Sequence, residues 1–437
     1  MPLRSALVLP FVAAALLASA CARTPAVTSA ALPGQSVPRH AATTAPRGLD
    51  AADLAAIRAR MRALVDAREV AGIVTLIQQR GRVLEFDAYG LADAGRRTPM
   101  RRDSVMAIAS MTKPVTGVAM MLLYEQGLWS LDDPITKFIP EFAGLQVMGA
   151  DGTLQPTRRA PTMRELMSHT AGFSYGFFGN SPVDRLYFDA HLIDPQSSLQ
   201  ELIDKLARLP LEHQPGTRWE YSIAVDIQGY LVEKLSGVPY TEFVRERILE
   251  PLGMKDTGFA VTGAARARLA FEHARGPDGR LVPKLPEGGR DAVAARVPSL
   301  PSPGGALYST AADYARFAQM LLNGGRLGSM RLLKPDTVAL MHTNALPAGV
   351  FAGGPGSRTE FGLDFAIAPD SAPGGEPWPA GTYYWSGIWG TYFWIDPLNE
   401  LVVVGMLQRA WTPGEGLQET LIARNAARQV IYDELRD

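Results

Sequence analysis

Strand-like runs stand at both ends of this chain, and helical patterns fill the sequence between them. Near the amino end, AGIVTLIQQ and VLEFDAYG are β-branched and aromatic runs separated by Arg80-Gly81, a pattern typical of a hairpin. Near the carboxyl end, TYYWSGIWGTYFWIDPLNELVVVGML predicts two or three more strands with a turn at Asp396-Pro397-Leu398-Asn399. A single layer that uses both ends of the chain satisfies this pattern. The sequence therefore predicts an α/β protein of the α+β type, with a helical region inserted into the sheet.

Apolar residues at helical spacing predict the helices of this fold. The first helix follows an Asp50 cap, and its apolar face is formed by Leu54, Ile57, Met61, Leu64 and Val65. Further helices are predicted in SMTKPVTGVAMMLLYEQG, PTMRELMSHTAG, SIAVDIQGYLVEKLSG and TAADYARFAQMLLNGG, and a last one covers roughly 417–435. We therefore expect the sheet to come from about 49–105 and 355–437, with a mainly helical region at about 106–354.

The amino-acid composition says more about the possible binding partners of the protein than about its fold. The 437 residues are 47% hydrophobic and 20% charged, which is ordinary for a globular protein. The formal net charge of −1 gives no electrostatic reason to expect nucleic acid. The six histidines lack metal-ligand spacing, and no glycine motif for a dinucleotide or a phosphate occurs, so neither a metal nor a cofactor is expected.

The first residues have the pattern of a secretory signal. Arg4 precedes the apolar run ALVLPFVAAALLASA, which is too short for a stable membrane span and ends in the small residues Ala18-Ser19-Ala20. The next residue, Cys21, is the only cysteine, so a disulfide within one chain is excluded. We therefore expect residues 1–20 to be a signal peptide and the protein to be exported.

The stretch LLASAC resembles the signal of a bacterial lipoprotein, in which the cysteine becomes the lipidated amino terminus. Ala18 stands where such signals usually have leucine, so simple cleavage and release is the alternative. Residues 21–48 are rich in Ala, Pro, Thr and Ser and predict a flexible tether, followed by one domain over 49–437. The expectation is a periplasmic protein attached to a membrane through a lipidated Cys21.

Two serines compete for the role of nucleophile. Ser174 lies in GFSYG, a G-x-S-x-G pattern that in α/β-hydrolases holds the reactive serine on a turn between a strand and a helix. Here a capped helix, TMRELMSHTAG, precedes the serine, and no helical pattern follows it. The context favours a loop serine between two turn glycines.

Ser110 is the stronger candidate because Lys113 follows it in an S-x-x-K motif at the start of a buried helix. Residues three apart share one helix face, so the amine rises beside the hydroxyl. A serine needs a base to become a nucleophile, and burial among apolar neighbours favours a neutral amine that can accept the proton. Taken alone, the tetrapeptide more often marks a helix-start serine with a solvated lysine.

Other segments of the chain strengthen the interpretation of the S-x-x-K motif. The chain resembles the serine β-lactamase-like hydrolases, which include class C β-lactamases, D-alanyl-D-alanine carboxypeptidases and family VIII carboxylesterases. Four segments carry the resemblance: AIASMTKPVTGVAMMLLYEQGLWSLDDPITKFIPEF, MRELMSHTAGF, HQPGTRWEYSIAVDIQGYLVEKLSG and PSPGGALYSTAADYARFAQMLLNGG. It extends from about residue 52 to the carboxyl end. It implies a β-lactamase/penicillin-binding-protein-like fold, an antiparallel sheet flanked by helices plus a helical domain.

The resemblance implies a role for each motif. Ser110 would form the acyl-enzyme, and Lys113 would work with Tyr221 of WEYSIAVD to deprotonate it and to protonate the leaving group. The stretch YYWSGIWG is similar to the third motif of the family, in the W-x-G form of family VIII esterases, and its implied substrate-lining residues are Trp385, Ser386 and Gly387. The backbone N–H groups of Ser110 and Ile388 would form the oxyanion hole. On spacing alone, Tyr221 is an ordinary core tyrosine.

Two departures from the β-lactamase pattern point toward esters. Trp385 stands where K-T-G has its lysine and cannot pair with a carboxylate, and Ile223 stands where Y-x-N has its asparagine. Both changes favour a neutral, more apolar acyl substrate. A nearby arginine could replace the missing charge, so these departures favour esters but do not exclude β-lactams or peptides.

We therefore expect an exported serine hydrolase, a carboxylesterase on small or medium acyl esters, whose partner is a small-molecule ester or amide. A β-lactamase or D-Ala-D-Ala carboxypeptidase that acts on β-lactams or cell-wall peptides is the second hypothesis. A non-catalytic, penicillin-binding-like envelope module with the same fold is the third. The sequence indicates no oligomeric state.

Overall fold

The computed structural model describes residues 48–286, 288–353, 356–369, 378–410 and 421–435. The predicted signal peptide, Cys21 and nearly all of the predicted tether lie outside these residues and stay predictions. Within the described part of the chain, no helix is both long and apolar enough to cross a membrane.

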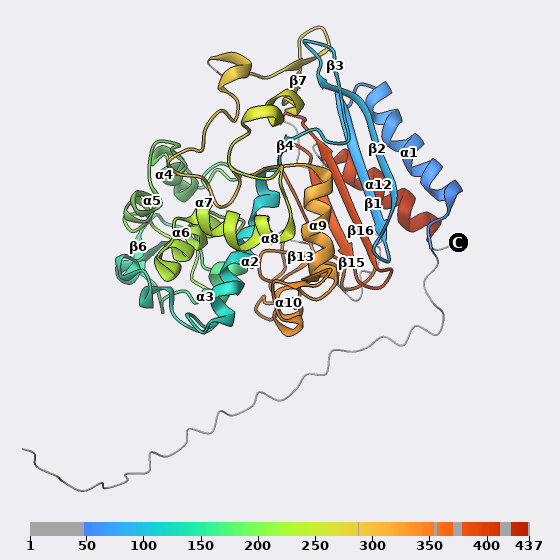
Figure 1. Cartoon of the computed structure of the whole chain (residues 1–437). Helices are drawn as coiled ribbons and strands as arrows, with labels where there is room; N and C mark the ends of the chain where they lie inside the picture. Colours follow the sequence, from blue (N-terminus) through green and yellow to red (C-terminus); the bar gives the residue numbers. More distant parts are fainter. Residues whose placement is uncertain (1–47, 287, 354–355, 370–377, 411–420, 436–437) are drawn as a thin grey trace, which may run out of the picture. The chain divides into compact units, whose positions relative to one another are not determined.

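One antiparallel sheet organises the structure, and both ends of the chain contribute to it (Figure 1). Among the described residues, its eight strands follow the order β12 (Glu360–Phe361), β13 (Ala366–Ile367), β14 (Tyr383–Ser386), β15 (Tyr392–Asp396), β16 (Leu401–Leu407), β1 (Gly72–Gln79), β2 (Arg82–Asp93) and β3 (Thr98–Pro99). Strand β1 pairs with β16, so that Ile73 lies opposite Leu407. The predicted α+β layer built from both ends is confirmed, whereas the sequence patterns do not predict the short edge strands β12 and β13.

Helices cover the sheet and form a separate helical region (Figure 1). The α-helices are α1 (Ala51–Asp66), α2 (Thr112–Glu125), α3 (Met163–Met167), α4 (Pro182–Asp189), α5 (Leu199–Leu206), α6 (Ala224–Ser236), α7 (Tyr240–Val244), α8 (Glu250–Leu252), α9 (Ala311–Leu322), α10 (Pro335–Met341) and α12 (Ile422–Glu434). Shorter turns are η1 (Ala109–Met111), η2 (Ile135–Lys137), η3 (Pro140–Gly144), η4 (Arg245–Leu249), η5 (Gly263–Arg268) and η6 (Gly289–Ala292). The small two-stranded pairs are β4 (Met106–Ala107) with β9 (Tyr308–Ser309), β5 (Gln146–Met148) with β6 (Leu154–Pro156), β7 (His273–Arg275) with β8 (Leu281–Pro283), and β10 (Arg326–Leu327) with β11 (Met330–Arg331).

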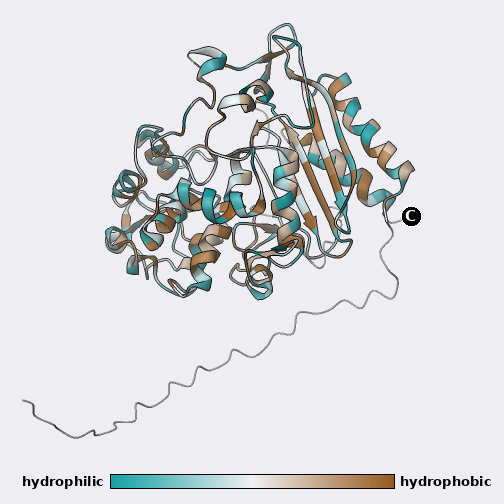
Figure 2. Ribbon diagram, viewed as in Figure 1, coloured by the Kyte–Doolittle hydropathy of each residue, from teal (hydrophilic) through white to brown (hydrophobic). Residues whose placement is uncertain are grey.

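The strands carry apolar side chains on both faces, which is why helices cover both. On β1, Ile73 and Ile77 join the core that contains residues of α1 and α12, whereas Val74 and Leu76 join the core that contains α2 and α9. The central strands are accordingly brown in the hydropathy view (Figure 2). A slip of one residue in register would exchange the two sets of side chains, so this pattern also fixes the register.

The helix that carries the S-x-x-K motif begins without a cap. Elsewhere the predicted signals hold: Asp50 accepts from the N–H groups of the first turn of α1, and Thr162 and Glu165 form a capping box on α3. Helix α2 has no side-chain cap and follows directly on the turn η1. Its residues 112–123 are all buried, against α6 and α7 among other elements. Lys113 therefore enters the protein interior and not the solvent.

Candidate active site

Ser110 lies where the helical region meets the sheet. The sequence predicts Ser110 in the first turn of the helix. It is instead the middle residue of the 3-10 turn η1, which directly precedes α2. Ala109 has a φ of +45°, a left-handed conformation that costs a non-glycine residue about 1–3 kcal/mol and clusters at functional sites. The Thr391 hydroxyl, from the loop after β14, donates to the Ile108 carbonyl at 3.2 Å and ties this turn to the sheet.

Gly387 allows the sheet to approach that turn. A Cβ at this position would lie 2.3 Å from the Thr391 Oγ1 and 2.5 Å from the Ile108 carbonyl oxygen, closer than any side chain tolerates. The glycine of the W-x-G motif is therefore required by the close contact between the end of β14 and the residues before Ser110.

The Lys113 side chain is 1% exposed and points toward Ser110. Its amine donates to the Gly304 carbonyl at 2.7 Å and to the Tyr175 hydroxyl at 3.2 Å, and it lies 3.4 Å from the Ser110 Oγ. A buried amine in contact with a serine hydroxyl is the arrangement that nucleophile activation needs. The structure thus places the two residues of the motif together, and their catalytic roles stay predictions.

Tyr175 is a site residue that the sequence reasoning missed. Besides contacting Lys113, its hydroxyl lies 3.5 Å from the Asp226 Oδ2. Burial, and then the nearby Asp226 and Tyr221, raise the pKa of Tyr175 well above its usual value, so this group is a neutral phenol. It stands inside the GFSYG stretch, whose only recognised signal concerns the serine.

Tyr221 also joins the site, through its ring. The Lys113 Nζ lies 4.7 Å from the ring centroid, and the rings of Tyr175, His169 and Trp385 pack around it at 5.0–5.5 Å. Within the described residues, its buried hydroxyl has no hydrogen-bond partner. A buried hydroxyl without a partner calls for an explanation, and a catalytic role is one such explanation.

We expect Tyr221→Phe to lower the kcat for ester hydrolysis by about 10²-fold or more while leaving the melting temperature unchanged or raised. The reason is that the substitution removes a proton-transfer group but no hydrogen bond. Tyr175→Phe is the matched control. It removes a hydroxyl that Lys113 does contact, so this variant should have a lower melting temperature. Full activity of Tyr221→Phe would contradict the assigned role.

Two buried carboxyl groups surround the lysine. Asp226 accepts from the Ser302 hydroxyl at 2.7 Å and the Gly304 N–H at 3.2 Å, and burial raises its pKa, an effect that Lys113 opposes. Burial raises the pKa of Asp364 to about 8, against the opposing effects of a hydrogen bond from Gln228 and the charge of Lys113. These carboxyls do not form a metal centre: in the described ranges, no three His, Cys, Asp or Glu side chains are grouped as metal ligands.

The raised pKa of Asp364 predicts a dependence of stability on pH. Because the pKa of about 8 in the folded state exceeds the unfolded value, this group stabilises the fold fully below about pH 4, and the contribution is lost as the pH rises toward 8. Up to about 1.4 kcal/mol is lost per pH unit in that window. Asp364→Asn, which cannot ionise and tolerates the φ of +65°, should flatten the decline. Urea denaturation at pH 5, 6.5 and 8 gives the free energy of unfolding of both proteins. An equal decline with pH in the two proteins would refute the prediction.

A cavity of about 330 Å³ opens beside Ser110. Ser110 and Ile388, the two residues predicted to supply the oxyanion-hole N–H groups, both line it. Most of the remaining wall is apolar, and it includes Tyr175, Phe177, Phe178, Ile193, Pro195 and Leu300. The site is therefore shaped for a carbonyl group with apolar substituents.

The three predicted substrate-lining residues of the third motif are not equivalent. The Trp385 ring packs on Tyr221 at the site, and Gly387 contacts the serine turn. Ser386 lies opposite Tyr392, and its hydroxyl is 3.4 Å from the Arg424 guanidinium of α12. Successive strand residues face opposite sides, so the Ser386 side chain points to the α1–α12 face and does not line the substrate as expected.

The Ser174 hydroxyl forms its hydrogen bonds within a structural cluster and not with the lysine. Its hydroxyl donates to the Asp184 carboxylate and accepts from the Gly176 N–H at 3.0 Å. Both motif glycines adopt positive φ, +95° at Gly172 and +86° at Gly176, which is turn geometry. The G-x-S-x-G stretch is thus a buried loop whose serine fixes the start of α4.

Comparison with known proteins agrees with this geometry. A family model described as Beta-lactamase matches residues 57–428. The protein "Esterase EstB" of Burkholderia gladioli is 33% identical over 402 residues, which cover 88% of this chain and 96% of that protein. "Lovastatin esterase" of Penicillium rubens is 29% identical over 342 residues, covering 72% and 82%. The solved structure "EstCE1, a hydrolase with promiscuous acyltransferase activity" superposes with a TM-score of 0.72 at 28% identity, covering 87% of this chain and 99% of that one.

The match spans the strands at both ends, the S-x-x-K turn and the helical region, which is nearly all of the described chain. Of the three similar proteins named above, two are called esterases and the third a hydrolase with promiscuous acyltransferase activity. The chain therefore belongs to the β-lactamase family, has its fold, and is an enzyme of the serine hydrolase type.

Proposed function

We propose that this protein is a carboxylesterase that forms an acyl-enzyme on Ser110 and acts on small or medium acyl esters. One observation carries the proposal: the buried Lys113 amine reaches the Ser110 Oγ at the wall of a largely apolar cavity. The names of EstB and lovastatin esterase add support, since both are called esterases.

The chemistry follows from the positions of the groups. The Ser110 Oγ attacks the ester carbonyl while its proton passes to the Lys113 amine, either directly or through the hydroxyl of Tyr221 or Tyr175. The carbonyl oxygen becomes negative and is stabilised by the N–H groups of Ser110 and Ile388. The C–O bond to the alcohol then breaks, and the alcohol takes the proton. Water attacks the acyl-serine by the same route, releasing the acid and the free hydroxyl.

The third motif and the apolar wall of the cavity favour an ester over a β-lactam. A tryptophan, Trp385, occupies the position of the lysine that the K-T-G motif supplies, and its ring packs on Tyr221. Phe177 and Phe178 extend the apolar wall and contact the Tyr175 ring at 4.6 and 5.6 Å. An acyl chain buries apolar surface on these rings at about 25 cal/mol per Å².

A panel of three substrates tests the function. Protein lacking residues 1–21 would be assayed on p-nitrophenyl butyrate, a chromogenic cephalosporin and a peptide ending in D-Ala-D-Ala. We expect the ester to have the highest kcat/KM. Higher turnover of the cephalosporin or the peptide would favour the β-lactamase or carboxypeptidase alternative. A failure of a phosphonate ester to label the protein would favour the non-catalytic module.

We also propose that the protein is exported and lipidated at Cys21, on the sequence pattern that ends in Ala18-Ser19-Ala20. Expression in a bacterium fed labelled palmitate should give a labelled protein in the membrane fraction. Cys21→Ser should lose the label and appear in the soluble periplasmic fraction. Labelling of the serine variant to the same extent would show that the cysteine is not the attachment point.

A further inference from the structure

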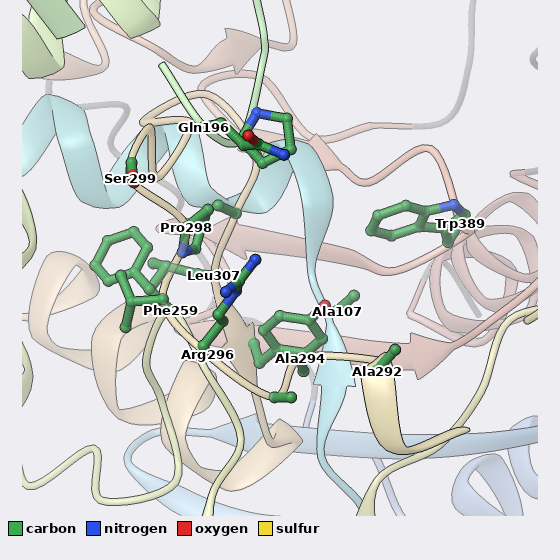
Figure 3. Close-up of a pocket in the computed structure, with 16 residues that line it drawn as sticks. Ala107, Gln196, Phe259, Ala292, Ala294, Arg296, Pro298, Ser299, Leu307 and Trp389 are labelled. Carbon is green, nitrogen blue, oxygen red and sulfur yellow. The ribbon is translucent and has the colours of Figure 1, made fainter. Parts of the chain in front are cut away.

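A second, larger cavity adjoins the one at Ser110. Its volume is about 770 Å³, and it shares a wall with the first cavity, formed by Pro195, Pro298, Gly305, Ala306 and Trp389. Figure 3 shows its lining, in which the labelled residues from Ala292 to Ser299 extend from the side of Trp389 to the opposite side. The second cavity therefore lies directly beside the one that contains Ser110.

Arg296 is the charged residue in the lining of the second cavity. Its side chain extends among Pro298, Leu307 and Ala294 (Figure 3). No Asp or Glu is among the described residues that line this cavity. Within the described part of the chain, no hydrogen bond or ion pair is found for the Arg296 guanidinium. Arg296 is an exposed residue, so solvent covers its donors in the free protein and a ligand can reach them.

The segment that carries Arg296 is fixed on both sides. The Arg266 guanidinium donates to the carbonyls of Arg290 and Val293 at 3.0 and 2.8 Å. On the other side, the Ser299 N–H donates to the Pro195 carbonyl at 2.9 Å. Two neighbouring arginines are thus used for structure, Arg266 on backbone and Arg290 on Asp93, whereas Arg296 between these anchors is not.

We infer that the preferred ester carries a carboxylate at a distance from the scissile carbonyl, and that Arg296 binds it in the second cavity. This inference rests on the proposed esterase function and names its substrate class. A guanidinium binds carboxylates through paired N–H donors, and the pairing strengthens where acidic competitors are absent. The side-chain amide of Gln196 and the hydroxyl of Ser299 lie in the same lining and offer further donors.

Two pairs of esters distinguish where the carboxylate is attached. The acyl pair is mono-4-nitrophenyl glutarate and 4-nitrophenyl pentanoate, and the alcohol pair is 4-carboxyphenyl butyrate and 4-acetylphenyl butyrate. In the pair that matches the natural substrate, Arg296→Ala should lower kcat/KM for the charged ester by about tenfold to a hundredfold and for the neutral ester by less than twofold. Arg296→Lys should recover part of the loss. Added NaCl should reduce the turnover of the charged ester in the unmodified enzyme.

The control is Arg60→Ala, which removes an exposed arginine from α1 and should change neither ester. If Arg296→Ala leaves the charged-to-neutral ratio unchanged in both pairs, the inference is wrong while the esterase function stands. If the unmodified enzyme hydrolyses none of the four esters, the proposed function itself has failed.

Discussion

Replacing Ser110 by alanine is expected to lower ester turnover by about 10³-fold or more, with the fold preserved. The only hydrogen bond of its hydroxyl within the described residues is the 3.4 Å contact with Lys113, so its loss removes the nucleophile and little stability. The measurements are kcat on p-nitrophenyl butyrate and the site of phosphonate labelling, located by mass spectrometry. We expect the label on the peptide that contains Ser110 and no label on Ser110→Ala.

Ser174→Ala is the matched control, because the same atom is removed from the competing motif. Its hydroxyl is a buried donor to Asp184, and removing it leaves a carboxylate short of one partner. We expect a loss of about 1–3 kcal/mol in the free energy of unfolding and turnover within a few-fold of the unmodified enzyme. The opposite result, an inactive Ser174→Ala beside an active Ser110→Ala, would assign the nucleophile to the G-x-S-x-G motif.

The predictable part of the site is the part that is local in sequence. Ser110 and Lys113 are three residues apart, so helical geometry alone brings them together. Tyr175 and the Gly304 carbonyl reach the same amine from 62 and 191 residues away, and no motif relates either of them to Lys113. Contacts of this kind depend on how loops pack between helices. A pattern within one element therefore cannot indicate them.

The alternation of side chains along a strand predicts that Ser386 and Trp385 cannot both face the substrate, although the resemblance to the third motif implies that both do. In YYWSG, Trp385 and Ser386 are consecutive strand residues, so their side chains must face opposite sides of the sheet. The third motif therefore cannot place both side chains against the substrate. The fold is easier to predict from the sequence than the site, because the apolar runs at both ends need a shared sheet. The register of Ile73 with Leu407, in contrast, depends on side-chain packing across two separate cores.

Lys113 is the second position where we expect a large effect. Lys113→Met keeps the length and apolar volume of the side chain but removes the amine, and kcat should fall by about 10²–10⁴-fold, as for a lost general base. While it is protonated, the Lys113 amine also opposes the raised pKa of Asp226 and Asp364, and the variant removes this effect. Both carboxyls should then hold their protons to higher pH. Its stability should therefore decline more steeply between pH 5 and 8 than that of the unmodified enzyme.

Lys113→Arg separates the two roles that the amine can have. A guanidinium keeps the positive charge near Ser110 and the buried carboxyls, but it does not give up its proton in a protein. If Lys113 accepts the serine proton, Lys113→Arg should be as inactive as Lys113→Met, although its stability profile with pH resembles that of the unmodified enzyme. Circular dichroism at each pH establishes that both variants are folded when assayed. Substantial hydrolysis by the arginine variant would mean that a fixed charge beside Ser110 is sufficient, and that another group, Tyr175 or Tyr221, takes the proton.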